Sequence, residues 1–144
     1  MKRLSRALSA ALLALALLLS ACGAGLSGPS YEIDLGSSSL FTQKELERAA
    51  VLIQRKFASF RGCELHAIRY AGDYASTQEN LEWLNILRQQ DEPFVDCALF
   101  LSDFHSPKED LPGEAWNLDY EYLDWQWWLG RTADGSWVLV TWGY

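Results

Sequence analysis

The sequence predicts an α+β domain in which one long amphipathic helix packs on a curved antiparallel sheet of about four strands. Three observations support this fold class. The segment Thr42–Arg61 repeats apolar residues at the helical period, which is typical of a helix with one buried face. Runs of alternating residues flank Asp134-Gly135, which strongly indicates a β-hairpin. Two more strand-like segments lie between helix and hairpin, separated by a short second helix.

The long helix has clear start and stop residues. Thr42 is a favourable N-cap, and Glu45 three positions later completes a capping box. Phe41 and Leu46 occupy the positions of a hydrophobic staple. Arg61-Gly62 provides a basic last turn and a glycine stop. The predicted buried face consists of Leu46, Ala49, Ala50, Ile53, Phe57 and Phe60.

The middle of the chain predicts strands 1 and 2 of the sheet, with the short helix between them. The segment Cys63 to Arg69 alternates and forms the first strand. Ser76 and Glu79 have the spacing of a second capping box and begin the short helix, which ends before Pro93. The run from Phe94 to Phe104 predicts a second, mostly buried strand.

Strict alternation assigns two faces to the predicted strands. In the first strand, one face carries Cys63, Leu65, Ala67 and Arg69, and the other carries Glu64, His66, Ile68 and Tyr70. In the first strand of the hairpin, one face carries Leu123, Trp125, Trp127 and Leu129, and the other carries Tyr122, Asp124, Gln126 and Trp128. If the tryptophan pair Trp125 and Trp127 faces the helix, then Tyr122 and Trp128 lie on the opposite side.

Residues 1–21 predict a lipoprotein signal peptide. A basic start, Met1–Arg6, precedes a run of Ala and Leu to Ala21 that is too short to span a bilayer comfortably as a mature helix. The run ends in Leu19-Ser20-Ala21-Cys22, which resembles the lipobox of bacterial lipoproteins. The resemblance implies cleavage before Cys22 and lipid on its sulfur and amino group. We therefore expect a signal peptide over 1–21, a Gly- and Ser-rich flexible tether over 22–40, and one α+β domain over 41–144. Within the tether, Tyr31–Leu35 is a candidate for a short extended segment.

Charge and location limit the classes of partner. Three of the twelve basic residues and none of the nineteen acidic ones lie in residues 1–21, so the rest of the chain has a formal charge of −10. This balance excludes nucleic acid as a partner, because phosphate recognition depends on basic clusters. We expect the protein on the outer face of the cytoplasmic membrane, with the membrane as a partner through the lipid on Cys22.

Several sequence pieces resemble an uncharacterised lipoprotein family of Gram-positive bacteria, from about Phe41 to the C-terminus. The pieces are Phe57–Leu65, Leu99–Phe104, Asp124–Trp127, Gly135–Trp137 and Trp142–Tyr144. The resemblance implies an extracytoplasmic binding or sensing role and no assigned activity. The predicted elements also look like a cystatin-like or NTF2-like cone, with the helix in the concave face of the sheet.

Asp103 and His105 are the candidates for acid–base chemistry, because they stand at a strand end beside a long loop. The acidic residues of that loop match no known calcium-binding spacing, and no pair of histidines or cysteines has the spacing of a transition-metal site. We expect no metal and no cofactor.

Cys63 and Cys97 are predicted at opposite ends of neighbouring strands, which favours two free thiols over a disulfide.

Aromatic residues carry the main functional hypothesis. Residues 120–144 hold five of the seven tryptophans, more aromatic surface than one helix covers. We expect Tyr120, Tyr122, Trp128 and Trp142 to form a ligand-binding face for a protein or small molecule. The predicted function is therefore that of a membrane-anchored, non-catalytic binding or sensing lipoprotein. The alternatives are an NTF2-like enzyme using Asp103 and His105 in the cone, or a structural lipoprotein that dimerises through its sheet.

Overall fold

The computed structural model describes residues 30–144, so the predicted signal peptide and lipidated Cys22 lie outside the described residues. The fold is α+β, with two helices and an open, mixed sheet of five strands in the order β1-β2-β3-β4-β5. The elements in chain order are β1 (Glu32–Asp34), α2 (Gln43–Phe57), β2 (Glu64–Tyr70), a 3-10 turn (Asp73–Ala75), α3 (Gln78–Arg88), β3 (Asp96–His105), β4 (Glu121–Arg131) and β5 (Trp137–Gly143). The predicted position of the short helix between the second and third of these strands is confirmed.

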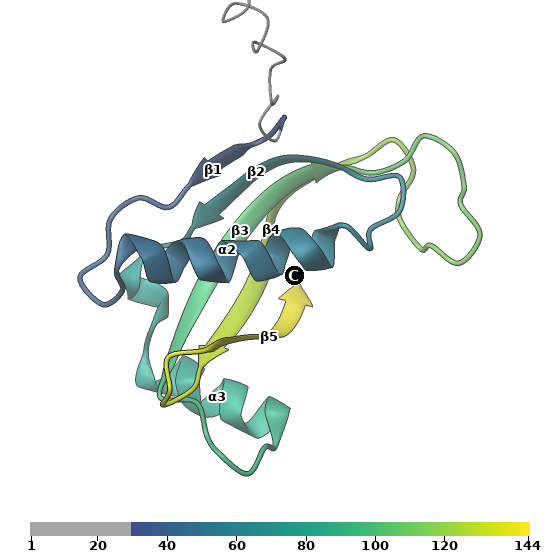
Figure 1. Ribbon diagram of the computed structural model, residues 1–144. Coiled ribbons are helices and arrows are strands. Elements are labelled where there is room, and N and C mark those ends of the chain that lie inside the picture. Colours follow the sequence, from purple (N-terminus) through teal and green to yellow (C-terminus); the bar gives the residue numbers. More distant parts are fainter. Residues whose placement is uncertain (1–29) are drawn as a thin grey trace, which may run out of the picture. The chain divides into compact units, whose positions relative to one another are not determined.

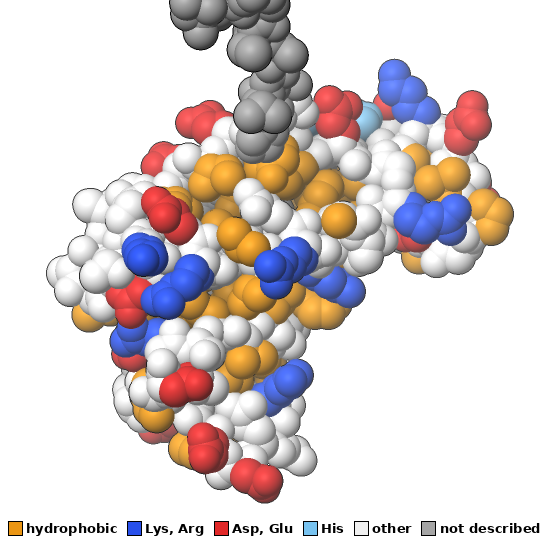
Figure 2. Space-filling model, viewed as in Figure 1, with side chains coloured by type: hydrophobic (Ala, Val, Ile, Leu, Met, Phe, Trp, Pro, Cys, Tyr) orange, Lys and Arg blue, Asp and Glu red, His pale blue; other side chains and the backbone are white. Residues whose placement is uncertain are grey.

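Helix α2 lies across the concave side of the curved sheet (Figure 1). Its predicted capping box is confirmed: Glu45 N–H donates to Thr42 Oγ1 over 3.3 Å, and Thr42 N–H donates to Glu45 Oε2 over 2.8 Å. The predicted apolar face is buried, and its residues share one core with Trp127 of β4. The helix ends at Phe57 rather than Arg61, but Phe60 remains in that core. Figure 2 shows Lys and Arg side chains gathered over its outer face.

Two β-bulges overturn the predicted strict alternation. His66 is an extra residue in β2, because Leu65 pairs with Phe104 whereas Ala67 pairs with Asp103. Leu65 and Ile68 therefore both join the core under α2, although alternation placed them on opposite faces.

In β4 the extra residue lies beside Asp124, which has a left-handed φ of 54°. Across this bulge, Tyr122 turns into the core and Leu123 becomes exposed, the reverse of the prediction. The prediction is right beyond the bulge, where Trp125, Trp127 and Leu129 face α2.

The sheet is neither wholly antiparallel nor limited to four strands. β1 adds a fifth strand at the edge and runs parallel to β2, with Ile33 opposite Ile68. It falls on Tyr31–Leu35, the candidate extended segment within the expected tether 22–40, and it ties that part of the tether into the sheet. Leu35 and Phe41 are buried after it, and the Asp73 carboxylate accepts the backbone N–H of Ser39 over 2.8 Å. The folded unit therefore begins at Tyr31.

Helix α3 packs on the face of the sheet opposite α2, and it contributes to a second, smaller core of Leu84, Phe94 and Cys97. Its N-cap is Thr77, whose Oγ1 accepts from Asn80 N–H, so the predicted capping box from Ser76 is wrong. Phe94 lies directly on Gly130 of β4, where any side chain would overlap its ring. None of the helices in residues 30–144 is long and apolar enough to cross a membrane.

The predicted hairpin is confirmed. β4 and β5 pair antiparallel, and the turn closes where Thr132 N–H donates to Ser136 O over 2.9 Å. Gly135 takes the left-handed conformation that the turn requires, with a φ of 85°. The Trp137 indole N–H donates to Glu45 O over 3.0 Å, which joins the hairpin to the first turn of α2.

Candidate functional site

Asp103 lies on the sheet face away from α2, because its neighbours Ser102 and Phe104 point the other way. Its carboxylate forms a two-pronged ion pair with Arg69, at 2.5 and 2.9 Å, and also accepts the backbone N–H of Asp124 over 2.9 Å. Arg69 also contacts the Asp124 carboxylate at 2.9 Å. The Arg69 guanidinium lowers the pKa of Asp103, which therefore stays ionised.

His105 stands two residues further along the same face. Its Nε2 contacts Asp119 Oδ1 at 2.9 Å, and its Nδ1 contacts Glu121 Oε2 at 3.0 Å. Hydrogen bonds to these two carboxylates, from Asp119 first and then Glu121, raise the pKa of His105. The second oxygen of Glu121 contacts His66 Nδ1 at 2.8 Å, and the two imidazole rings stack with centroids 6.5 Å apart.

The contacts around Asp103 and His105 fix these side chains and do not leave them free for acid–base chemistry. Both carboxylate oxygens of Asp103 and both ring nitrogens of His105 already have protein partners. Neither residue lies between α2 and the sheet, where the enzyme alternative would need them. Among residues 30–144, no group of three His, Cys, Asp or Glu side chains is placed to hold a metal ion. The chemistry that this cluster supports is electrostatic pinning of the loop from Ser106 to Tyr120 against the sheet.

The four predicted ligand-binding aromatics do not share one face. Tyr122 is buried against Phe104, with stacked rings 4.9 Å apart, so it belongs to the core. Tyr120 is 51% exposed and packs edge-on against the Tyr122 ring at 5.0 Å. Trp142 is 40% exposed, on the α2 side, with Lys56 Nζ 4.2 Å from its ring centre. Trp128 lies on the α3 side, partly buried against the second core.

A dense aromatic cluster fills the end of the α2 face beneath the C-terminus. Its members are Phe57, Phe60, Phe104, Trp116, Tyr122, Trp125, Trp127 and Tyr144. The Trp127 indole N–H donates to Ser102 Oγ over 2.8 Å, and both groups are buried. By contrast, the buried indole N–H of Trp125 finds no hydrogen-bond partner within residues 30–144. The rings fill this end of the molecule by packing on one another.

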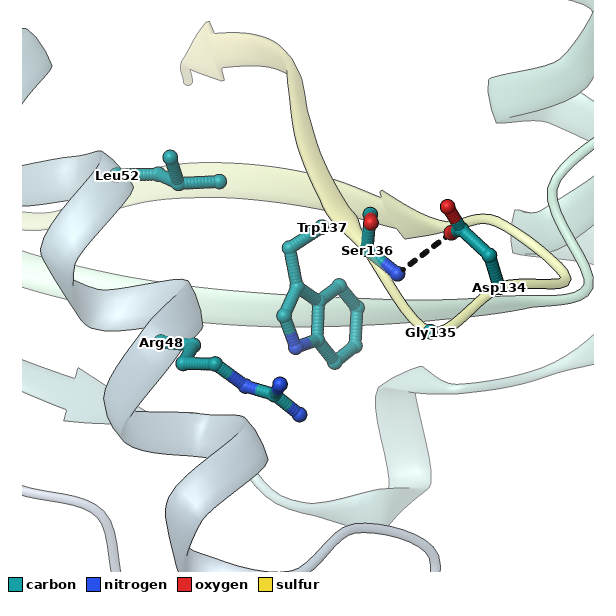
Figure 3. Close-up of a pocket in the computed structure, with 6 residues that line it drawn as sticks. All are labelled: Arg48, Leu52, Asp134, Gly135, Ser136 and Trp137. Carbon is teal, nitrogen blue, oxygen red and sulfur yellow. Dashed lines mark hydrogen bonds between the residues drawn. The ribbon is translucent and has the colours of Figure 1, made fainter.

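A shallow recess of about 250 Å³ lies between α2 and the hairpin turn (Figure 3). Arg48 and Leu52 project from α2 on the side that faces Trp137, and residues 134–136 of the turn form the far wall (Figure 3). Ser136 N–H donates to the Asp134 carboxylate over 3.0 Å, so this acid supports the turn. Sequence reasoning named none of these residues as a site.

A second recess, of about 210 Å³, lies where the end of β5 meets β4 and α3. Its lining consists of Trp83, Gln126, Trp128, Thr141, Trp142, Gly143 and Tyr144. Two predicted ligand-binding residues, Trp128 and Trp142, thus meet here, although they belong to different faces. Sequence reasoning missed Trp83, which lies edge-on to Trp128 with ring centres 5.4 Å apart. The available indication was a tryptophan beside, rather than within, the apolar stripe of its helix.

Cys63 and Cys97, the cysteines within residues 30–144, are both free thiols, as predicted. Cys63 precedes Glu64, which pairs with His105, whereas Cys97 stands at the other end of β3 opposite Gly130. Burial raises the pKa of both thiols to about 11, with a smaller contribution from Glu114 or Asp96, respectively. Both therefore stay protonated at neutral pH and are poor nucleophiles.

Comparison with known proteins adds no assignment to this geometry. No family model, no curated protein and no solved structure matches the chain.

Proposed function

We propose that this protein is a lipid-anchored, extracytoplasmic binding protein without catalytic activity. The observation that carries the binding role is the set of large aromatic side chains left exposed on α3, at the start of β4 and at the end of β5. Trp83, Trp142, Tyr120 and Tyr144 are all more than a third exposed. Exposed aromatic groups of this size mark interaction sites more often than isolated surface residues do.

The anchor rests on the N-terminal sequence. The basic start Met1–Arg6, the apolar run and Leu19-Ser20-Ala21-Cys22 together favour export and lipidation of Cys22. The excess of acidic residues after Ala21 fits a domain held outside a membrane, with no nucleic acid as a partner. Membership of the Gram-positive lipoprotein family belongs to the same proposal.

The likeness to the cystatin-like or NTF2-like cone is also part of the proposal. It is supported by α2 lying in the concave face of a curved sheet whose last four strands form an antiparallel meander (Figure 1). In such a cone the space under the helix would be the natural ligand site. Here that space is filled by side chains such as Phe100, Phe104 and Trp127. A ligand site on the surface, outside the space under the helix, is therefore favoured.

The enzyme alternative and the structural alternative each require a different feature of the structure. The enzyme alternative requires Asp103 and His105 in a recess, but neither lines either recess described above. The structural alternative requires a dimer through the sheet, and the open edge strand β5, which carries no charged side chain, favours it. Sedimentation of the full chain distinguishes dimerisation from binding: twice the monomer mass, lost on Trp128→Lys, would replace the binding role by the structural one.

The anchor is tested by feeding an alkynyl palmitate analogue to cells that express the full chain. We expect label on the wild type, which should sediment with membranes, and neither label nor membrane association on Cys22→Ser. Cys63→Ser is the matched control and should keep both. Label that persists on Cys22→Ser would contradict the anchor.

A further inference from the structure

The recess at the end of β5 has the shape of an aromatic corner. Trp83 and Trp128 meet at an interplanar angle of 81°, so one indole forms a wall and the other a floor. Trp142 of β5 also lines the recess, but its ring lies on the α2 side beside Lys56. The two indoles that face the recess therefore come from α3 and β4.

Neither Trp83 nor Trp128 is among the fully buried residues of a core. Trp83 is 39% exposed and Trp128 is partly exposed, whereas Trp127, the residue before Trp128, is fully buried. The smaller core under α3 is already built from Leu84, Phe94 and Cys97. Indole surface left at the mouth of a recess gains hydrophobic and stacking stabilisation when a ligand covers it.

The remaining lining residues define the chemistry of that ligand. All seven residues carry uncharged side chains. Gln126 Oε1 accepts the Trp128 indole N–H over 3.0 Å, which orients the amide and leaves its NH₂ group to donate. Thr141 contributes a hydroxyl that both donates and accepts.

With no charged side chain in its lining, the recess suits a neutral ligand that has an apolar face for the indoles and a polar edge for the amide and hydroxyl. A pyranose ring has both: its axial C–H groups form a weakly positive, apolar face that suits the negative face of an aromatic ring. Its equatorial hydroxyls point outward toward polar side chains. The volume of about 210 Å³ is below the roughly 300 Å³ at which sites for drug-sized ligands begin, so it suits a single ring.

We propose that this recess is a binding subsite for one ring of a neutral saccharide. The inference rests on the proposed binding role but not on the lipid anchor. Trp83 and Trp128 would hold the sugar ring at their corner, and Gln126 and Thr141 would bond its hydroxyls.

The test uses the full chain in a detergent without a sugar headgroup. The probes are trisaccharides of N-acetylglucosamine, β-1,4-linked glucose and α-1,4-linked glucose, and the readout is the set of indole N–H resonances. At least one trisaccharide at millimolar concentration should shift the signals of Trp83 and Trp128 and leave those of Trp116, Trp125 and Trp137 in place. The inference is overturned if none of the three sugars moves these signals.

Variants assign the binding to the recess. Trp83→Ala should weaken binding by about fivefold or more, because it removes one wall. Gln126→Leu keeps the volume but removes the amide, and it provides the same test if Trp83→Ala unfolds. Tyr74→Ala removes an exposed aromatic ring that lines neither recess, and it should bind like the wild type. Equal affinity of all three variants would place the sugar elsewhere and refute the subsite.

Two outcomes distinguish the saccharide subsite from a peptide groove and from the lipid anchor. A proline-rich peptide that shifts the same indole signals when no sugar does would make the recess a peptide groove and overturn the saccharide assignment. If the chain takes the palmitate label but binds no sugar, the saccharide subsite is refuted and the lipid anchor is supported. Cys22→Ser should bind sugar with unchanged affinity, since the recess does not involve the N-terminus.

Discussion

The two faces of the sheet are built from the same strands and yet differ in almost everything else. Under α2 there is one large core that includes Phe100, Phe104 and Trp127. On the opposite face, the core under α3 contains only three fully buried residues. The rest of that face carries the Asp103 and His105 ion pairs and the aromatic recess.

The difference follows from the two helices. α2 has 15 residues and buries five of them along its whole length. α3 has 11 residues, of which only Leu84 is buried, and it sits at the end of the sheet where β3 begins. Figure 1 shows the loop between β3 and β4 at the other end. Alternation within a strand thus determines which residues share a face, but the length and placement of the covering helix determine whether that face becomes core or site.

Adjacent tryptophans in β4 provide the strongest test of this comparison. Trp127→Ala should lower the free energy of unfolding by about 3–5 kcal/mol, because it opens a cavity in the α2 core. Trp128→Ala should cost only about 1–2 kcal/mol, because its ring is partly exposed on the α3 side. Urea unfolding followed by circular dichroism measures both. Equal losses would mean that the two faces contribute equally to stability.

The contact between Phe94 and Gly130 tests whether the smaller core is tightly packed. Gly130→Ala should lower the free energy of unfolding by about 2–3 kcal/mol, because the new methyl group overlaps the Phe94 ring. In a Phe94→Leu background the same change should cost clearly less. Thermal unfolding of the four proteins of this double-mutant cycle gives the coupling. Additive effects would show that the ring moves away freely.

Phe variants of Trp125 and Trp127 distinguish the contribution of indole hydrogen bonding from that of ring burial to stability on the α2 face. Trp127→Phe leaves the buried Ser102 hydroxyl without its donor and should cost about 1–3 kcal/mol. Trp125→Phe should cost less, because its buried indole N–H has no partner to lose. Adding Ser102→Ala should recover part of the loss in Trp127→Phe alone. The reverse order of the two Phe variants in urea unfolding would contradict this assignment.

The elements that the sequence predicts correctly are those with local causes. The capping box at Thr42 and the Asp134-Gly135 turn are each encoded within a few residues, so α2 and the hairpin are found without tertiary information. β1 is missed as a full strand because three residues carry too little pattern to reveal a parallel partner about 35 positions later.

The faces of the strands depend on bulges that leave little trace in the sequence. Asp tolerates the left-handed conformation, but Asp124 has no turn residues around it to mark the bulge. Leu123 and Tyr122 are therefore assigned to the wrong sides. For the candidate site, alternation correctly puts Asp103 and His105 on one face, but their partners Arg69 and Glu121 come from neighbouring strands. Partners of that kind follow from register, which the sequence alone does not supply.

The Asp103–Arg69 pair should contribute a modest, acid-sensitive stabilisation. Arg69→Met should lower the free energy of unfolding at neutral pH by about 1 kcal/mol, since both groups are partly exposed. Because the pKa of Asp103 is lowered in the folded state, its contribution is present above the unfolded pKa and is lost as the pH falls through the folded pKa. The stabilities of wild type and variant should therefore converge in acid. A constant difference down to low pH would rule out the charge as its cause.

His105 should show the opposite pH dependence and the smallest effect. Asp119 and Glu121 raise its folded pKa above the ordinary value of 6.5. Its contribution is therefore fully present below the unfolded pKa and is lost as the pH rises through the folded pKa. The stability of the wild type should therefore fall as the pH rises from neutral to mildly alkaline. His105→Gln has no group that titrates here, so the stability of the variant should not show this fall. His66→Gln is the control that leaves both carboxylates of His105 in place. If urea unfolding gives wild type and His105→Gln the same slope between neutral and mildly alkaline pH, the charged cluster does not pin the loop.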